Sequence, residues 1–463
     1  MAIAPSKVKL TKSAAGILNA IRNGIGGDYY AGVPEAQDTT DSIKAVGTAI
    51  LAQQSRRNDF VNALVNRVGY EILKSKQYQN PWAVFKKGFL EYGETVEEIF
   101  TNLCEVRGFD PANAKTNVLK VTKPNISVAF HTLNVQVEYP VTISNAQLRQ
   151  AFLSATALTS FIDGIISNMY TSMNYDEFLL MKYQLAVLAL NGELPKTTIS
   201  TPGAATAASI ATVIKEKSND MVFMSDAFTI SGNKNYTNKE DQYLIEQSGL
   251  NAVLDVNVLA TSFNMDKAEF TGHVILMDDL GKLDQARLAK LLDKDTGYQA
   301  FNATQLGYLS KIRGLLCSRD FFQIYDVEQT MEDFKNGSGL YWNYFLHKWQ
   351  VLSASPFENV LLLTDQASAV SSISVALDAA SMSAAGTNGA TATVTTTGFA
   401  SKEVTWDLVV GTGTAADKTN GLISIDAYGV ITLKTGYHTG TWTVKATSVE
   451  DGTTTGTATL TLA

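Results

Sequence analysis

The residue types that most often carry out acid–base or metal chemistry are scattered in this sequence. A transition-metal site needs several His, Cys or carboxylate ligands at short, regular spacings. Neither the two cysteines, Cys104 and Cys317, nor any histidine has a second ligand at such a spacing. We therefore expect structural or surface roles for all four histidines, which are His131, His273, His347 and His438.

Two short polar segments resemble ligand-binding loops only superficially. Gly411–Thr419 is rich in glycine and threonine, but a phosphate-binding loop needs Gly directly before its Lys, and Asp417 would repel a phosphate. Asp278 and Asp279 could bind a divalent cation. Two adjacent acids after a strand more often form a solvated turn, and we expect a turn here. The sequence therefore predicts no catalytic residue, no metal ligand and no cofactor.

Several charged and aromatic residues are candidates for contacts between copies of the chain. Lys86 and Lys87 are expected to contact an acidic neighbour or solvent, without a covalent cross-link, and the Glu97-Glu98 pair to lie on a solvated face. The aromatic run Tyr341–Trp349 has apolar residues on both faces, which is typical of a strand in a buried sheet; a subunit contact is the alternative. The candidate inter-subunit contacts are Lys86, Lys87, Glu97, Glu98, Trp342 and Trp349.

Length and composition limit the classes of protein that remain. A chain of 463 residues is long enough for two or three domains, and 45% hydrophobic with 18% charged residues fits a folded protein. The formal charge of −8 argues against a dedicated nucleic-acid binder. We expect no signal peptide, no transmembrane span and no disulfide framework, and hence a product of the reducing cytoplasm.

The elements that would position these residues follow a mixed order of helices and strands, an α+β arrangement. Residues 1–69 begin with a basic arm, because Lys7, Lys9, Lys12 and Arg22 meet no acidic residue in 1–27, and continue with helical spacing. Residues 70–143 contain strand-like runs interrupted by prolines, which indicates a long, exposed two-stranded excursion.

A long helix is the strongest single prediction. Ser144 and Gln147 form a capping box, apolar residues then recur at helical spacing, and Asn191-Gly192 is a natural end. We place this helix in residues 144–196. Residues 197–330 alternate helix and strand, and 331–364 are rich in aromatic and other apolar residues.

Composition changes after residue 364. All nine prolines lie at or before Pro356, and residues 365–372 are small and polar, as in a linker. Residues 373–463 have apolar residues at period two, with turns at Asn388-Gly389, Asn420-Gly421 and Asp451-Gly452. Val404–Trp406, Gly421–Thr432 and Val444–Ala446 resemble the group 2 bacterial Ig-like family, which implies an immunoglobulin-like sandwich used for display or adhesion.

The first 364 residues resemble the major capsid proteins of small tailed phages of the phi-29 type. The blocks that carry this resemblance occur in the same order, and that family also has a C-terminal group 2 Ig-like domain. The blocks are Asn58–Phe60 with Leu64-Val65 and Arg67–Gly69, Asn80-Pro81 with Phe85–Gly88, Thr95–Phe100, Leu254–Val256 with Val258–Ala260, Phe263–Met265, and Gly339–Tyr344 with His347 and Trp349-Gln350. The stretch from about Gly281 to Gln305 looks longer than the family pattern.

The resemblance implies a Hong Kong 97-like capsid fold for residues 1–364. Its parts would be an N-terminal arm and helices (1–69), an extended loop (70–143), a spine helix (144–196) with a peripheral domain (331–364), and an axial domain (197–330). The implied function is self-assembly into the icosahedral or prolate head of a bacteriophage.

The partners implied by the resemblance are other copies in pentamers and hexamers, a scaffolding protein and a portal. Double-stranded DNA would be enclosed through weak non-specific contact. The head would assemble in the host cytoplasm, with no membrane partner. The alternative is a cell-surface adhesin or glycan-binding protein with an Ig-like module; a soluble enzyme would need a convergent polar pocket.

Overall fold

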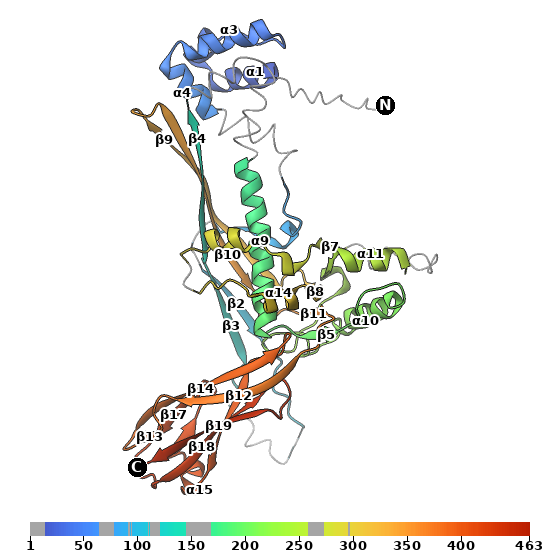
Figure 1. The fold of residues 1–463 in the computed structure, drawn as a ribbon, viewed down its shortest axis with the longest axis vertical. Coiled ribbons are helices and arrows are strands. Elements are labelled where there is room, and N and C mark those ends of the chain that lie inside the picture. Colours follow the sequence, from blue (N-terminus) through green and yellow to red (C-terminus); the bar gives the residue numbers. More distant parts are fainter. Residues whose placement is uncertain are drawn as a thin grey trace.

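A long, twisted four-stranded sheet links the two ends of the molecule (Figure 1). The computed structural model describes residues 14–63, 78–90, 93, 95–109, 111, 121–144, 168–257, 273–294 and 297–463. The strand order is β1-β9-β10-β4, with β1 at Lys86–Phe89, β9 at Phe322–Asn336, β10 at Tyr341–Ala354 and β4 at Val135–Ser144. β9 and β10 form an antiparallel hairpin, and β4 lies antiparallel to β10 at the edge of the sheet.

Four short helices cover one face of this sheet at the hairpin end. They are α1 (Ala14–Ile25), α2 (Gly27–Gly32), α3 (Thr40–Leu51) and α4 (Gln54–Ala63). The Thr39 hydroxyl caps α3 by accepting a hydrogen bond from the Ser42 amide. The helices bury Trp342 and Tyr344 of β10 together with Ile143 of β4, so the sheet and the helices share one core.

Helix α9 (Asn168–Asn191) packs against the same face of the sheet farther along it and is buried on most sides. On its other side lies a five-stranded sheet of order β5-β11-β8-β6-β7. The strands are β5 (Lys196–Thr198), β11 (Val360–Thr364), β8 (Ile312–Ser318), β6 (Gln242–Gln247) and β7 (Val274–Met277). The 3-10 segment η3 (Ala83–Phe85) joins this core through Phe85.

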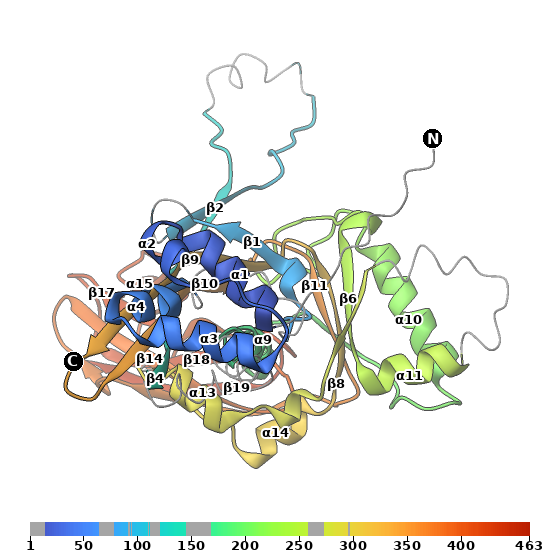
Figure 2. The same cartoon turned by 90° about the horizontal axis from the view of Figure 1, so that it is seen from above.

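Helices lie on both faces of the five-stranded sheet (Figure 2). On one face, α10 (Ala207–Asp220) and α11 (Ser248–Asn257) bury Ile214 and Leu250 against the strands. On the other face are α9, α13 (Gln285–Leu291) and α14 (Ala303–Leu309), with the 3-10 segment η7 (Leu280–Lys282) beside α14. A third 3-10 segment, η6 (Lys239–Asp241), leads into β6. This two-sided covering explains why β6 and β11 are buried along their whole length.

The C-terminal unit consists of two four-stranded sheets that enclose their own core, which includes Trp442 and Ile431. The first sheet contains β12 (Ala369–Leu377), β14 (Gly386–Thr397), β17 (Val430–Leu433) and β16 (Ile423–Ile425). The second contains β13 (Ser381–Met382), β19 (Thr455–Leu462), β18 (Gly440–Ser448) and β15 (Val404–Val410), and α15 (Ala415–Thr419) is a short connecting helix.

A loop of the C-terminal unit is inserted into the main core of the body. Phe399, which follows β14, is 1% exposed and packs near Tyr308 among the residues that surround α9. The Lys196 ammonium group donates to the Phe399 carbonyl oxygen at 3.2 Å. Gly192, at φ +75° just after α9, lies against the Ala400 carbonyl, where an added Cβ would be 2.4 Å from the oxygen. The C-terminal unit is thus anchored at the end of α9.

Most of the described elements lie where the sequence placed them, with two differences. The predicted linker 365–372 includes the start of β12 at Ala369. The prediction that both faces of Tyr341–Trp349 would be buried was wrong, because buried and partly exposed residues alternate along β10. The basic arm and the first part of the predicted long helix, residues 145–167, lie outside the described residues.

Candidate functional site

A two-stranded ribbon extends from the body and presents an apolar outer face. Strands β2 (Thr95–Thr101) and β3 (Ile126–Thr132) pair only with each other among the described strands. Side chains alternate in burial along both strands. On the outer face Ile99 lies opposite Val128, and their exposed fractions are 61% and 43%. Phe130 on the same face is 64% exposed, so the outer face leaves large apolar side chains in water.

The inner face of the ribbon is fixed to the body by polar and aromatic contacts. The Glu98 carboxylate lies 3.0 Å from Nε2 of His131 and accepts a hydrogen bond from the Ser355 hydroxyl at 2.8 Å. Nδ1 of His131 lies 2.8 Å from the Ser353 hydroxyl. Phe100 stacks on Phe357 with ring centroids 5.4 Å apart. Because these contacts occupy the inner face of the ribbon, the outer face is the side that a partner can reach.

A buried cluster of charges joins β1, β9 and β10 of the long sheet to α9. Lys86 of β1 lies 2.8 Å from the Glu177 carboxylate of α9 and 2.9 Å from Asp326 of β9. Lys348 of β10 lies 2.7 Å from Asp326, and the Gln350 side chain donates to both carboxylates. Two lysines and two carboxylates balance, which makes their burial tolerable.

Burial and the neighbouring charges shift the pKa values of Asp326, Lys348 and Lys86. Burial alone would raise the pKa of Asp326, but Lys348 and Lys86 outweigh it and hold the pKa below its usual value. Burial lowers the pKa of Lys348, and the nearby Lys86 adds to this effect. The pKa of Lys86 is raised, since burial is outweighed by Glu177 and Asp326.

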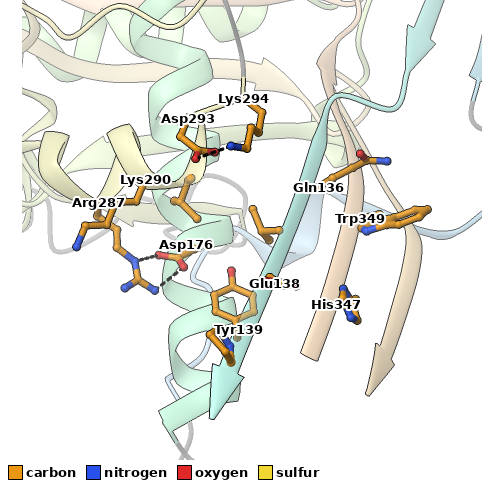
Figure 3. Close-up of a pocket in the computed structure, with 13 residues that line it drawn as sticks. Gln136, Glu138, Tyr139, Asp176, Arg287, Lys290, Asp293, Lys294, His347 and Trp349 are labelled. Carbon is orange, nitrogen blue, oxygen red and sulfur yellow. Dashed lines mark hydrogen bonds and ion pairs between the residues drawn. The ribbon is translucent and has the colours of Figure 1, made fainter. Parts of the chain in front are cut away.

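A groove runs along the edge strand β4 and has a volume of about 550 Å³ (Figure 3). Its charged residues largely pair with each other: Arg287 donates to both oxygens of Asp176 at 2.8 and 2.7 Å, and Lys294 lies 3.3 Å from Asp293. Beyond these pairs, Trp349 and His347 lie on the far side of the strand. Asp176 and Asp293 are already paired, so the groove, which Glu138 also lines, resembles a structural cleft more than a reaction centre.

The polar residues considered for chemistry have structural partners. Asp278 pairs with Lys182 at 2.9 Å, and Asp279 accepts a hydrogen bond from the Gly281 amide at 2.9 Å. Lys418 pairs with Asp407 rather than lining a phosphate loop. Among the described residues, no group of three His, Cys, Asp or Glu side chains could hold a metal ion. Within the same residues, no helix is both long and apolar enough to cross a membrane.

The six predicted contact residues lie in different settings. Lys86 and Glu98 are bound within the subunit, Lys87 pairs with Asp320, and Trp342 is 3% exposed in the core. Glu97 is exposed on the outer face of the ribbon, and Trp349 is partly exposed at the groove. The structure thus places these residues at separate locations and does not gather them into one surface.

The exposed apolar residues of the ribbon were missed as candidates. The alternation Ile126, Val128 and Phe130 was visible in the sequence, but such a pattern normally indicates a face turned to a core. Only the pairing of β3 with a single strand shows that this face has no core to cover.

Comparison with known proteins identifies the family. Residues 18–364 match the family described as Phi29-like phage major capsid protein. The major capsid protein of Bacillus phage B103 is 34% identical over 438 residues, which is 93% of this chain and 89% of that protein. The major capsid protein of Bacillus phage PZA is 31% identical over 414 residues, covering 88% and 86% of the two chains.

Solved structures with similar chains include a capsid structure of Staphylococcus phage Andhra, with a TM-score of 0.49 and 16% identity over 63% of this chain and 85% of that one. The family match and the two relatives cover most of the chain, including the ribbon, the charge cluster and the long sheet. The chain belongs to the family of Phi29-like phage major capsid proteins.

Proposed function

We propose that this chain, a major capsid protein of a tailed phage, assembles into the closed icosahedral or prolate head that encloses double-stranded DNA. The role is structural: the chain contributes contact surfaces to a shell and has no catalytic task. Family membership supports self-association and argues against the alternative function, a cell-surface adhesin. A scaffolding protein, a portal and assembly in the host cytoplasm belong to the same proposal.

The observation that carries the proposal is the outer face of the ribbon. Ile99, Ile126, Val128 and Phe130 are each at least 43% exposed and lie on one side of two paired strands. An exposed apolar strip of this kind marks a surface that gains stability when another surface covers it. A neighbouring subunit is the cover expected in a shell, since every copy presents the same strip.

The assignment of each of the two units to a known fold is part of the proposal. The order of a helical N-terminal part, an extended ribbon, a long helix and a five-stranded domain supports a Hong Kong 97-like body in residues 1–364. The two sheets of the C-terminal unit, with Trp442 in their core, support an immunoglobulin-like sandwich in residues 373–463. We assign that sandwich to decoration of the head or to contacts between capsomers.

The experiment replaces the central cross-strand pair of the outer face, Ile99→Lys with Val128→Lys. Two lysines should prevent a neighbour from covering the strip, because their charges would have to be buried. The subunit itself should keep its fold, since neither side chain enters its core. Circular dichroism checks folding, and electron microscopy and sedimentation count assembled heads.

The matched control is Thr95→Lys with Thr132→Lys, a directly opposed pair on the same face. This pair adds the same charge outside the apolar strip and should leave head assembly near the wild-type level. Wild-type numbers of heads from the Ile99–Val128 variant would refute the ribbon as the assembly surface. Absence of heads from the wild-type chain under all assembly conditions would refute the function itself.

A further inference from the structure

The ribbon is joined to the long sheet through a short junction. Among the described strands, β2 and β3 form a backbone ladder only with each other. β3 ends at Thr132, and β4 begins at Val135, where it already pairs with Gln350 of β10. Leu133 and Asn134 are therefore the two residues at which the chain leaves the ribbon and enters the sheet. Figure 2 shows the chain beyond β2 leading away from the body.

At this junction the hydrogen bonding of the sheet ends in a side chain. The Asn134 carboxamide donates to the Leu352 carbonyl oxygen at 2.8 Å and accepts from the Leu352 amide at 2.9 Å. Because a carboxamide has a donor and an acceptor, as a peptide group does, Asn134 makes the bonds that the next residue of a strand would otherwise make. The direction in which β3 leaves the sheet can thus change without loss of a backbone bond at Leu352.

Four side chains, which we call the clasp, hold the inner face of the ribbon against the end of β10. They are Glu98, His131, Ser353 and Ser355. Glu98 is bound by His131 within the ribbon and by the Ser355 hydroxyl of the body. The other ring nitrogen of His131 lies beside the Ser353 hydroxyl. His131 is 2% exposed and Ser355 is 0% exposed, so water is largely excluded and the hydrogen bonds of the clasp are stronger than they would be at the surface.

Two further contacts hold the same face of the ribbon. The Phe100 ring stacks on Phe357, and the Asn233 side chain donates to the Ser127 hydroxyl at 3.3 Å. Like the clasp, these contacts are made by side chains alone. A ribbon that keeps its own ladder intact can therefore separate from the body when these side-chain contacts are broken.

A like charge opposes the position in which the clasp is closed. Burial raises the pKa of Glu358, a hydrogen bond from the Ser318 side chain lowers it, and the Glu98 carboxylate raises it again. Lys87, the nearby cation, already pairs with Asp320. The hydrogen bonds of the clasp therefore hold Glu98 at a place where a second carboxylate repels it.

We propose that the ribbon is a lever that turns at Leu133 and Asn134, and that the clasp locks it in the position seen here. Release of the clasp lets the intact ribbon adopt other angles to the body. A shell with five-fold and six-fold positions places one sequence in several surroundings, and a lever of this kind lets each copy adjust to its own. The purpose of the lever rests on the proposed self-assembly, but the lever itself is a property of the single subunit.

The experiment measures the position of the ribbon in the unassembled, full-length subunit. Spin labels are attached to cysteines introduced by Thr101→Cys at the end of β2 and Lys215→Cys on α10, in a chain with Cys104→Ser; Cys317 is 0% exposed and should not react. Pulsed electron paramagnetic resonance should give one narrow distance between the two labels. Glu98→Ala should add a population at other distances and raise the ratio of released to locked ribbons by about tenfold, because hydrogen bonds to a charged group are lost.

Glu97→Ala is the matched control, because Glu97 is adjacent to Glu98 but exposed on the outer face. It should leave the distance distribution unchanged. If Glu98→Ala disturbs folding, Ser353→Ala with Ser355→Ala opens the clasp from the side of the body and leaves the ribbon residues as they are. Circular dichroism checks the fold of the subunit, and hydrogen exchange checks that the ladder between β2 and β3 remains.

Three results would overturn the proposal. The first is a distance distribution for Glu98→Ala with Phe100→Ala that does not differ from that of Phe100→Ala alone, since the clasp would then hold nothing. The second is an equal change in the Glu97→Ala control. The third is loss of the ladder between β2 and β3 in the clasp variants, because the ribbon would then unfold and not turn as one piece.

Failure of this inference is distinguishable from failure of the proposed function. The distances are measured before assembly, so the absence of heads from the wild-type chain would leave the result on the lever valid. Heads that form normally from a chain whose ribbon proves immobile would remove the lever and leave the capsid function intact.

Discussion

The Lys348 ammonium group lies 2.7 Å from the Asp326 carboxylate on the covered face of the long sheet, with both side chains less than 10% exposed. Two strands and, through Lys86 and Glu177, β1 and α9 therefore meet at one charged cluster. The cluster joins segments that are far apart in the chain, so the register of β9 against β10 and the positions of β1 and α9 are linked.

Removing one member of the pair should destabilise the subunit strongly. Lys348→Met leaves the Asp326 carboxylate with one lysine fewer in a buried site, and breaking such a pair typically costs about 3–5 kcal/mol. Urea unfolding of the unassembled subunit measures the loss. Lys217→Met is the control, because Lys217 pairs with Asp220 at the surface and should change stability by less than about 1 kcal/mol.

The same cluster should make stability depend on acid. The pKa of Asp326 is lowered in the folded state, so its contribution is present above the unfolded value of about 3.9 and is lost as the pH falls through the folded value. The difference in unfolding free energy between wild type and Asp326→Asn should therefore be largest near neutral pH and shrink below about pH 4. A difference that stays constant from pH 7 to pH 3 would contradict the assigned role of Asp326.

Phe399 should stabilise the body although it belongs to the C-terminal unit. Its ring is 1% exposed among residues around α9, and replacing a buried Phe by Ala typically costs about 3–5 kcal/mol. Phe399→Ala should lower the thermal midpoint of the body, as measured by calorimetry. Tyr428→Ala, in the same unit but 88% exposed, should leave that midpoint almost unchanged.

Gly192 should resist substitution for two separable reasons. It has φ +75°, and an added Cβ would lie 2.4 Å from the Ala400 carbonyl oxygen. Gly436 has φ +93° but no atom within 4 Å of an added Cβ, so Gly436→Ala reports the conformational cost alone. Gly192→Ala should be the more destabilising of the two in thermal unfolding, and equal losses would indicate that the loop at Ala400 moves freely.

Local patterns predicted the elements better than the surfaces they form. Alternating residues predicted the C-terminal strands, the aromatic run Tyr341–Trp349 predicted β10, and the stop at Asn191-Gly192 matches the end of α9. Lys86, by contrast, was expected to meet solvent or an acidic neighbour. Its partners, Glu177 and Asp326, are distant in sequence, and only the tertiary fold brings the three together. For the same reason the sequence did not indicate which side of β10 would remain open.

The insertion of Phe399 has a consequence for anyone who wishes to modify these heads. Truncation before β12 would remove Phe399 from the core of the body together with the appended unit. A truncated subunit could then fail to assemble because its body is destabilised, and not because the appended unit is missing from the surface of the head. A foreign peptide is better grafted at Gly436, where no atom lies within 4 Å of an added Cβ, than into the turn at Asp451–Thr454, because Glu450 beside that turn pairs with Lys196 and accepts a hydrogen bond from the Ser401 amide at the insertion. The appendage can carry cargo at its tip, provided that its root stays in place.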